Sequence, residues 1–197
     1  MKMSILLATL LAATNTASGP SFDCGRAATA TERRICANPE LAEADRLLAI
    51  VHSKVGRRAG LRREQLAWIA DRDRCDSESC IAASYEWRTM ELMGRVDMPL
   101  RYERRGNPDE PGRLGLAPLG DGRHLFQLAA FWRYPDGRNI NDSLAEGMVR
   151  IVGDRGVWRG RAGCSLTFLR KGRGWAVEEG AKCTNGLNVT MNGYYRG

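Results

Sequence analysis

Histidine is scarce in this sequence, and so are the motifs on which most enzymes depend. Only His52 and His124 occur among 197 residues, and their separation does not suit a pair of metal ligands. No serine lies in a nucleophile-elbow motif. The glycines between residues 112 and 122 lie in a proline-rich stretch, not between a strand and a helix, so they predict no phosphate-binding loop. We therefore expect a binding protein with no catalytic residue, metal ion or cofactor.

Long apolar runs are also missing. No stretch of about eighteen apolar residues occurs, so the sequence predicts no membrane-spanning helix. The composition, 43% hydrophobic and 27% charged, is typical of a folded globular protein and not of a disordered chain. A length of 197 residues allows one or two domains.

Residues 1–18 have the pattern of a cleavable signal peptide. Lys2 supplies a positive charge, residues 5–13 are apolar, and small residues follow as far as Ser18. Phe22 and Asp23 precede the first cysteine, and they do not form the small-residue motif that lipidation of a bacterial cysteine needs. We expect an exported protein, periplasmic or extracellular, whose signal peptide is cleaved and which carries no lipid anchor.

The cysteines favour disulfides, because an even number of thiols in an exported protein is typical of a disulfide framework. Zinc bound at Cys75 and Cys80 is the alternative, but it lacks histidine ligands at a suitable spacing. We prefer Cys75 paired with Cys80 across a tight turn, and Cys24 paired with Cys36 around a first short helix. A crossed pairing of Cys36 with Cys75 stays open. The six cysteines are Cys24, Cys36, Cys75, Cys80, Cys164 and Cys183.

Residues 22–97 form the first expected domain, and their apolar positions recur with helical spacing. Thr29 and Glu32 have the form of a capping box, which begins a short helix. Asn38 and Pro39 are typical of the cap and first position of a longer helix. Short connections make the helices antiparallel neighbours. The expected helices cover residues 30–36, 39–55, 61–75 and 81–92.

Three polar residues lie on or beside the apolar faces of these helices: Asp45, Gln65 and Arg72. A buried guanidinium needs a partner, and Asp45 faces Arg72 once the two helices run antiparallel. We interpret the three side chains as a structural polar clasp. The alternative is a binding or catalytic carboxylate in a cleft.

Proline, glycine and alternating apolar residues replace the helical pattern after Met98. Residues 98–112 are expected to be a linker, and residues 113–197 a second domain in which turns rich in glycine and asparagine separate the strands. The predicted fold class is α+β: a small disulfide-stapled antiparallel helical domain followed by an antiparallel, barrel-like β meander, with Cys164 and Cys183 tying two strands. The expected strands cover residues 114–119, 124–134, 147–152, 157–162, 165–170, 175–178, 187–191 and 194–195.

The net charge of +7 is unevenly distributed. Residues 23–97 contain 13 basic and 13 acidic side chains, whereas residues 98–197 contain 16 basic and 10 acidic ones, a balance of +6. In an exported protein this excess favours contact with anionic envelope glycans over nucleic acid. The alternative is solvated side chains at strand edges and hairpin tips. The clustered basic residues are Arg150, Arg155, Arg159, Arg161, Arg170, Lys171 and Arg173.

Several segments of the helical half carry recognisable motifs. They are Pro20 to Cys24, Thr31 to Asp45, the run Glu64-Gln-Leu-Ala-Trp-Ile-x-x-Arg-Asp-x-Cys75, and Cys80-x4-Tyr85-x-x-Arg88. These motifs resemble the N-terminal domain of the LprI family of lysozyme inhibitors. The resemblance implies lysozyme as the partner and protection of peptidoglycan from host muramidases as the role.

A second resemblance concerns the β half. In the LprI family a domain similar to the MliC inhibitors of animal-type lysozyme follows the helical domain, and the run from Cys183 to Tyr194 looks like its last strands. The serine- and lysine-bearing loops with which those inhibitors plug the lysozyme cleft have no counterpart that we can place, so no inhibitory residue is carried over. Animal lysozymes are basic, so a domain of charge +6 would be repelled by them at long range. The competing interpretations are a module that binds anionic envelope glycans and a partner of another envelope protein.

Overall fold

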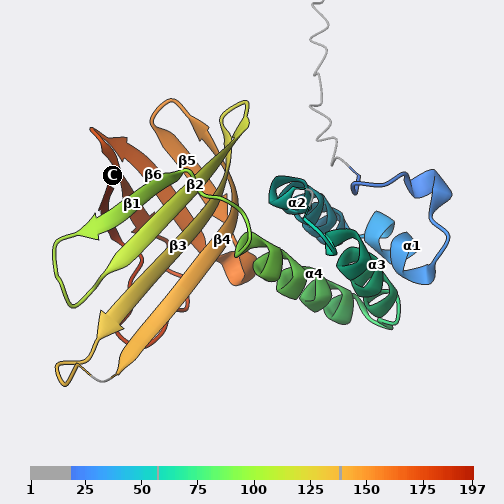
Figure 1. Ribbon diagram of the computed structural model, residues 1–197, viewed down its shortest axis with the longest axis horizontal. Coiled ribbons are helices and arrows are strands. Elements are labelled where there is room, and N and C mark those ends of the chain that lie inside the picture. Colours follow the sequence, from blue (N-terminus) through green and yellow to red (C-terminus); the bar gives the residue numbers. More distant parts are fainter. Residues whose placement is uncertain (1–18, 57, 138) are drawn as a thin grey trace, which may run out of the picture.

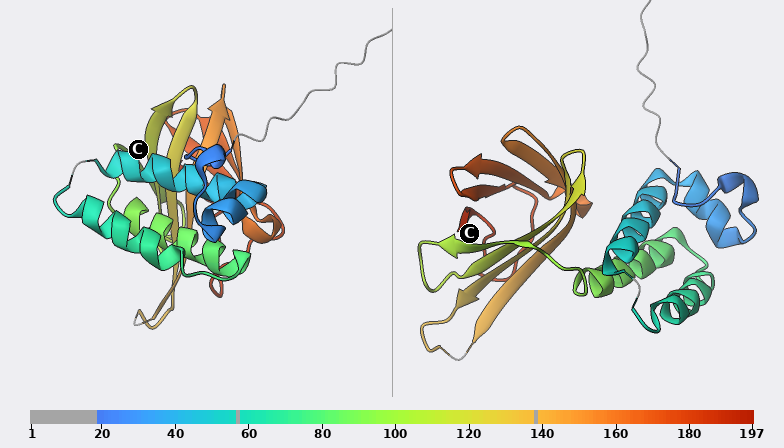
Figure 2. Two further views of the ribbon diagram at one scale, coloured as in Figure 1. Left: turned by 90° about the vertical axis from the view of Figure 1, so that its right-hand side faces the viewer. Right: turned by 45° about the horizontal axis from the view of Figure 1, so that its top comes forward.

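A computed structural model describes residues 19–56, 58–137 and 139–197, so the expected signal peptide lies outside the described residues. The chain forms a helical domain followed by an antiparallel β-barrel, which confirms the predicted α+β class (Figure 1). The two parts lie at opposite ends of an elongated molecule (Figure 2).

The helical domain begins with a short 3-10 helix, η1, and continues with helices whose starts are capped as the sequence predicts. Thr29 and Glu32 form the complete capping box of α1, and Asn38 caps α2 through the amides of Glu40 and Leu41. The helices are η1 (Cys24–Arg26), α1 (Ala30–Ala37), α2 (Pro39–Val55), α3 (Leu61–Arg72) and α4 (Glu78–Met93).

Two helix ends differ from the sequence prediction. The third helix was expected to reach Cys75 but ends at Arg72, because the chain turns at Asp73 to close the disulfide loop. The fourth helix was expected to begin near Ile81 but begins at Glu78, because the Ser77 side chain accepts a hydrogen bond from the Cys80 amide.

Three disulfides join the cysteines of the described residues in the preferred arrangement. Cys24 pairs with Cys36, Cys75 with Cys80, and Cys164 with Cys183. The first ties η1 to α1, the second closes the turn between α3 and α4, and the crossed pairing is not formed. Each bridge stabilises the fold chiefly by restricting the unfolded chain.

The barrel is a closed antiparallel meander in which each strand pairs with the next and β8 pairs with β1. Every strand thus has a neighbour on both sides, although β4 pairs with β5 only through Ile151 and Val152. Its strands are β1 (Leu100–Arg105), β2 (Gly112–Gly120), β3 (Arg123–Arg133), β4 (Ile140–Val152), β5 (Arg155–Arg159), β6 (Ser165–Lys171), β7 (Gly174–Glu179) and β8 (Gly193–Arg196), with a short 3-10 helix η2 (Arg161–Gly163) between β5 and β6.

Large apolar side chains fill the interior of the barrel. Phe126 is fully buried and packs edge-on against Trp158 and Phe168, with ring centroids 5.4 and 5.1 Å away. Gly147 makes room for this cluster, because a Cβ there would lie 2.7 Å from the indole nitrogen of Trp158. The aromatic cluster therefore occupies the space that a larger barrel would leave for a ligand.

The order of strands corrects two parts of the sequence prediction. Residues 98–112, expected to be a linker, contain β1, which closes the barrel by pairing with both β2 and β8. Residues 187–191, expected to be a strand, form none; Val189 and Met191 instead pack into the barrel core. Both errors arise because contacts with distant strands, and not local patterning, decide these conformations.

The outer face of β2 and β3 packs directly against the helical domain. Ala117 and Leu125 are buried in the same apolar cluster as the helical core, and Met98 joins them. The Lys54 side chain of α2 also donates a hydrogen bond of 3.3 Å to the carbonyl oxygen of Pro118. The two domains are thus joined through a shared apolar contact.

The aromatic cluster predicts a large cost for Phe126→Ala. Removing a fully buried ring leaves a cavity, so we expect the free energy of unfolding, measured by urea denaturation, to fall by about 3–5 kcal/mol. The control is Val152→Ala on β4, where the side chain is 71% exposed and the expected change is within about 0.5 kcal/mol. Equal effects of the two substitutions would contradict the packing described here.

Candidate functional site

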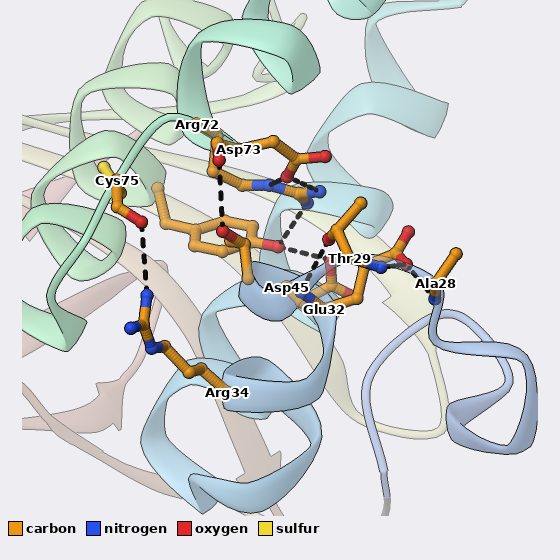
Figure 3. Close-up of polar contacts among 10 residues, drawn as sticks. Ala28, Thr29, Glu32, Arg34, Asp45, Arg72, Asp73 and Cys75 are labelled. Atoms are coloured by element: carbon orange, nitrogen blue, oxygen red, sulfur yellow. Dashed lines mark hydrogen bonds and ion pairs between the residues drawn. The ribbon is translucent and has the colours of Figure 1, made fainter.

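A chain of buried polar side chains connects the helices α2, α3 and α4. Asp45, Arg72 and Tyr85 are only 7%, 5% and 1% exposed. Arg72 donates a hydrogen bond of 2.9 Å to the hydroxyl of Tyr85, and this hydroxyl donates one of 2.7 Å to Asp45. Figure 3 shows Asp45 and Arg72 approaching the same point from different helices.

The direct partner of Arg72 differs from the sequence prediction. Its guanidinium binds the carboxylate of Asp73, with nitrogen–oxygen distances of 3.0 and 2.7 Å, and reaches Asp45 through Tyr85. The second oxygen of Asp45 accepts a hydrogen bond of 2.5 Å from the Ser21 amide. The expected Asp45–Arg72 ion pair is therefore replaced by a relay through a tyrosine.

Gln65, the third member of the predicted clasp, lies in a separate cluster. Its side-chain oxygen accepts a hydrogen bond of 3.2 Å from Arg88. Arg88 also binds Glu91 at 2.7 Å, and Arg95 bridges Glu64 and Glu91. The structure thus separates Gln65 from Asp45 and Arg72 and places it in a second network between α3 and α4.

Electrostatics keep both protons of the relay in place. Burial, together with the negative charge of Asp45, holds the pKa of Tyr85 well above its ordinary value. Burial alone would lower the pKa of Arg72. The interactions of its guanidinium with Tyr85 and Asp73 outweigh burial, so the pKa of Arg72 is raised. Tyr85 is therefore a neutral donor to Asp45 at physiological pH, and Arg72 stays charged. The polar atoms of the relay bind one another inside the domain, which favours a structural role for these side chains. From here on, the clasp means Asp45, Arg72 and Tyr85, without Gln65.

A shallow groove of about 290 Å³ lies between the end of α2 and the start of α3. Leu61 and Leu66 supply apolar surface, and Leu66 is 57% exposed. Arg58 and Arg62 are exposed at its border. The remaining lining residues are His52, Gly56 and Gln65.

A second apolar surface lies on α4. Trp87 is 69% exposed and Met90 37% exposed, and their spacing of three residues places them next to each other on one helix face. Ala83 precedes Trp87 by one helical turn on the same face and is exposed as well. We refer to Ala83, Trp87 and Met90 as the α4 face.

The basic residues singled out in the sequence spread over β4 to β7. Arg155 and Arg159 on β5, and Lys171 at the end of β6, alternate with inward-pointing residues and are exposed on the outside of the barrel. Arg170 instead lies 5.1 Å from the ring centroid of Trp175. Arg150 on β4 and Arg173 in the turn after β6 are exposed, and Arg161 belongs to η2.

Three residues of the structure had no predicted role in the sequence. Tyr85 stood out only as part of the Cys80-x4-Tyr85-x-x-Arg88 motif, and its place between Asp45 and Arg72 depends on the packing of three helices. Trp87 lies outside the periodic apolar face of α4, so the spacing of apolar residues does not single it out. Glu146, on the outer face of β4, has its pKa raised by burial to about 7 and accepts a hydrogen bond of 3.2 Å from Gln127.

Within the described residues, no helix is long and apolar enough to cross a membrane. The same residues contain no group of three or more histidine, cysteine, aspartate or glutamate side chains that could hold a metal ion.

The fold places the protein in the class of two-domain proteins that join a disulfide-stapled helical domain to a closed antiparallel barrel. Residues 24–93 match the family model described as "Lysozyme inhibitor LprI". The match spans η1 and α1 to α4 and confirms the resemblance of the helical domain to that family of inhibitors. It ends before β1, so the likeness of the barrel to the MliC inhibitors stays a prediction. No curated protein and no solved structure matches the chain.

The clasp predicts that Tyr85→Phe destabilises the protein although it removes a single oxygen atom. Asp45 and Arg72 would each lose a buried hydrogen bond, so we expect the free energy of unfolding to fall by about 1–3 kcal/mol. Tyr194→Phe is the matched control, because that hydroxyl binds the Lys171 carbonyl at the surface and its loss should cost under about 0.5 kcal/mol. Thermal or urea unfolding measures both, and an unchanged Tyr85→Phe variant would contradict the relay.

Proposed function

We propose that this chain is an exported, non-enzymatic protein that binds lysozyme and inhibits it. The observation that carries the proposal is the match of residues 24–93 to the lysozyme inhibitor family. Inhibition of lysozyme would protect peptidoglycan from muramidases.

The chemistry of the helical domain supports a binding role over a catalytic one. Asp45, Arg72 and Tyr85 satisfy one another inside the domain, so they present no acid–base pair to a substrate. Neither histidine helps, because His52 lies in the helical groove and His124 lies on β3.

The cysteines support export as part of the same proposal. All six form disulfides, and such bonds persist in oxidising compartments such as the periplasm or the extracellular space. Export by the expected signal peptide, cleavage of residues 1–18 and the absence of a lipid anchor belong to the proposal.

Charge favours the helical domain as the part that contacts lysozyme. Residues 98–197 carry a balance of +6, whereas residues 23–97 are neutral overall. Animal-type lysozymes are basic, and charges of the same sign on two surfaces disfavour their encounter. The barrel is therefore the less suitable surface for this partner.

We expect the purified mature protein to inhibit animal-type lysozyme in a titration that follows the lysis of bacterial cell walls. Each lysozyme molecule bound in a specific complex is lost to lysis, so the lytic activity should fall as the protein is added. At micromolar protein the activity should level off once each lysozyme has bound one inhibitor. The reduced and unfolded chain serves as the control and should leave lysis unchanged. A flat titration with the folded protein would contradict the proposed function.

A second candidate function is binding of anionic envelope glycans by the barrel. The observation that favours it is the exposure of Arg155, Arg159 and Lys171 on the outside of neighbouring strands β5 and β6. Ionic contacts of this kind weaken with salt, because exposed charges are screened over about 8 Å at physiological ionic strength.

This second candidate predicts that the protein sediments with purified peptidoglycan or lipopolysaccharide and is released by salt. Replacing Arg155, Arg159 and Lys171 by glutamine should reduce the bound fraction several-fold. The matched control replaces three exposed arginines of β1, β2 and β8, Arg101, Arg113 and Arg196, which changes the net charge equally. An equal loss in both triple variants would indicate attraction by net charge without a defined surface.

A further inference from the structure

The α4 face combines exposed apolar area with a rigid support. Trp87 is 69% exposed, yet the helix beneath it is fixed by Ile81, Tyr85 and Leu92, which are all at most 1% exposed. Tyr85, two residues earlier, belongs to the clasp. α4 packs against both α2 and α3 (Figure 1). Trp87 is thus held on a fixed element without being used in the fold.

The chain around the α4 face is acidic although the helical domain as a whole is neutral. From Asp71 to Met93 it carries six carboxylates and three guanidinium groups, a balance of −3. Two of those guanidinium groups, on Arg72 and Arg88, are buried. Arg74 is exposed and pairs with Asp71. The exposed carboxylates of this segment are Asp71, Asp76, Glu78, Glu86 and Glu91.

Ion pairs offset part of this negative charge. Glu91 binds both Arg88 and Arg95, and the Arg95 side chain is 33% exposed at the end of the helix. Glu78 accepts a hydrogen bond of 2.7 Å from the neutral Asn38 side chain, which leaves its charge in place. Glu86 is directly next to Trp87 and is exposed. A partner that reaches Trp87 therefore meets carboxylates on the same helix.

The groove between α2 and α3 has the opposite electrostatic character. Leu66 offers an exposed apolar side chain there, with 57% exposure, but the neighbouring charged groups are Arg58 and Arg62. A basic partner would be attracted to the α4 face and repelled by the groove, since like charges placed opposite each other disfavour a complex.

We propose that the α4 face, centred on Trp87 and bordered by Glu86 and Glu91, is the surface that docks a basic protein of the lysozyme class. This inference rests on the proposed function and assigns it to particular residues. The indole ring supplies the buried apolar anchor that dominates many interfaces, and the carboxylates supply charge complementarity. The basic barrel favours the same orientation, because it repels a basic partner from the other end of the molecule.

The test measures the affinity of the full mature chain for animal-type lysozyme by surface plasmon resonance, alongside inhibition of lysis. Trp87→Ala should weaken binding at least about tenfold, as expected for an aromatic anchor. Leu66→Ala is the matched control, because it removes an apolar side chain of similar exposure from the same domain, and it should change affinity less than about twofold. Circular dichroism and thermal unfolding verify that both variants fold.

A charge pair tests the acidic border separately. Glu86→Lys and Glu178→Lys change the net charge equally, but Glu178 is exposed on β7 of the barrel. We expect Glu86→Lys to weaken binding about tenfold, mainly through slower association. Glu178→Lys should stay within about twofold of the unchanged protein.

The outcomes separate the surface from the function. Weakened binding by Trp87→Ala and Glu86→Lys, with both controls unaffected, supports the α4 face. If the unchanged protein binds lysozyme and Trp87→Ala binds equally well, or Leu66→Ala is the damaging variant, the α4 face is overturned while the proposed function stands. If the unchanged protein does not bind lysozyme at all, both are overturned.

Discussion

The hydroxyl of Tyr85 is the contact on which the helical domain depends. It accepts a hydrogen bond from Arg72 and donates one to Asp45, and so it lets two buried charges of opposite sign stay inside a small apolar core. Without this bridge each charge would lack one of its few partners, at a cost that a small domain can hardly offset. The Cys24–Cys36 disulfide ties η1 to α1, and the Cys75–Cys80 disulfide closes the turn between α3 and α4. Both restrict the unfolded chain and so stabilise the same domain.

The clasp also has a consequence for function. By satisfying Asp45 and Arg72 internally, it leaves the surface of the domain as the part that can recognise a partner. The clasp fixes α4, and α4 carries Trp87 on its exposed side. The same helix leads through Met98 into the apolar contact with the barrel. A neutral domain with one acidic, apolar face and a basic barrel suits a binding protein that orients its partner by charge.

Local chemistry in the sequence was sufficient to predict much of the fold. Capping by Thr29 and Asn38 located two helix starts, and the helical spacing of apolar residues predicted which segments form the four helices. Long-range contacts were not predictable in the same way. The sequence of β1 is rich in charge and reads as a linker, and it becomes a strand because β2 and β8 lie on either side of it. The sequence predicted a direct Asp45–Arg72 ion pair, whereas the structure joins the two residues through Tyr85. Placing Tyr85 between them requires the packing of three helices. Trp87 was missed because periodicity identifies buried faces and gives no signal for an exposed anchor.

Hydroxyl-radical footprinting of the full mature chain, with and without animal-type lysozyme, shows whether Trp87 lies in the contact with lysozyme. Trp and Met side chains oxidise readily when exposed, so the method reports on Trp87 and Met90 without altering the sequence. We predict that lysozyme protects these two residues, while Leu66 in the α2–α3 groove and Leu187 on the barrel oxidise as in the free protein. Protection confined to the barrel or to the groove, with Trp87 and Met90 still oxidised at the unbound rate, would contradict it.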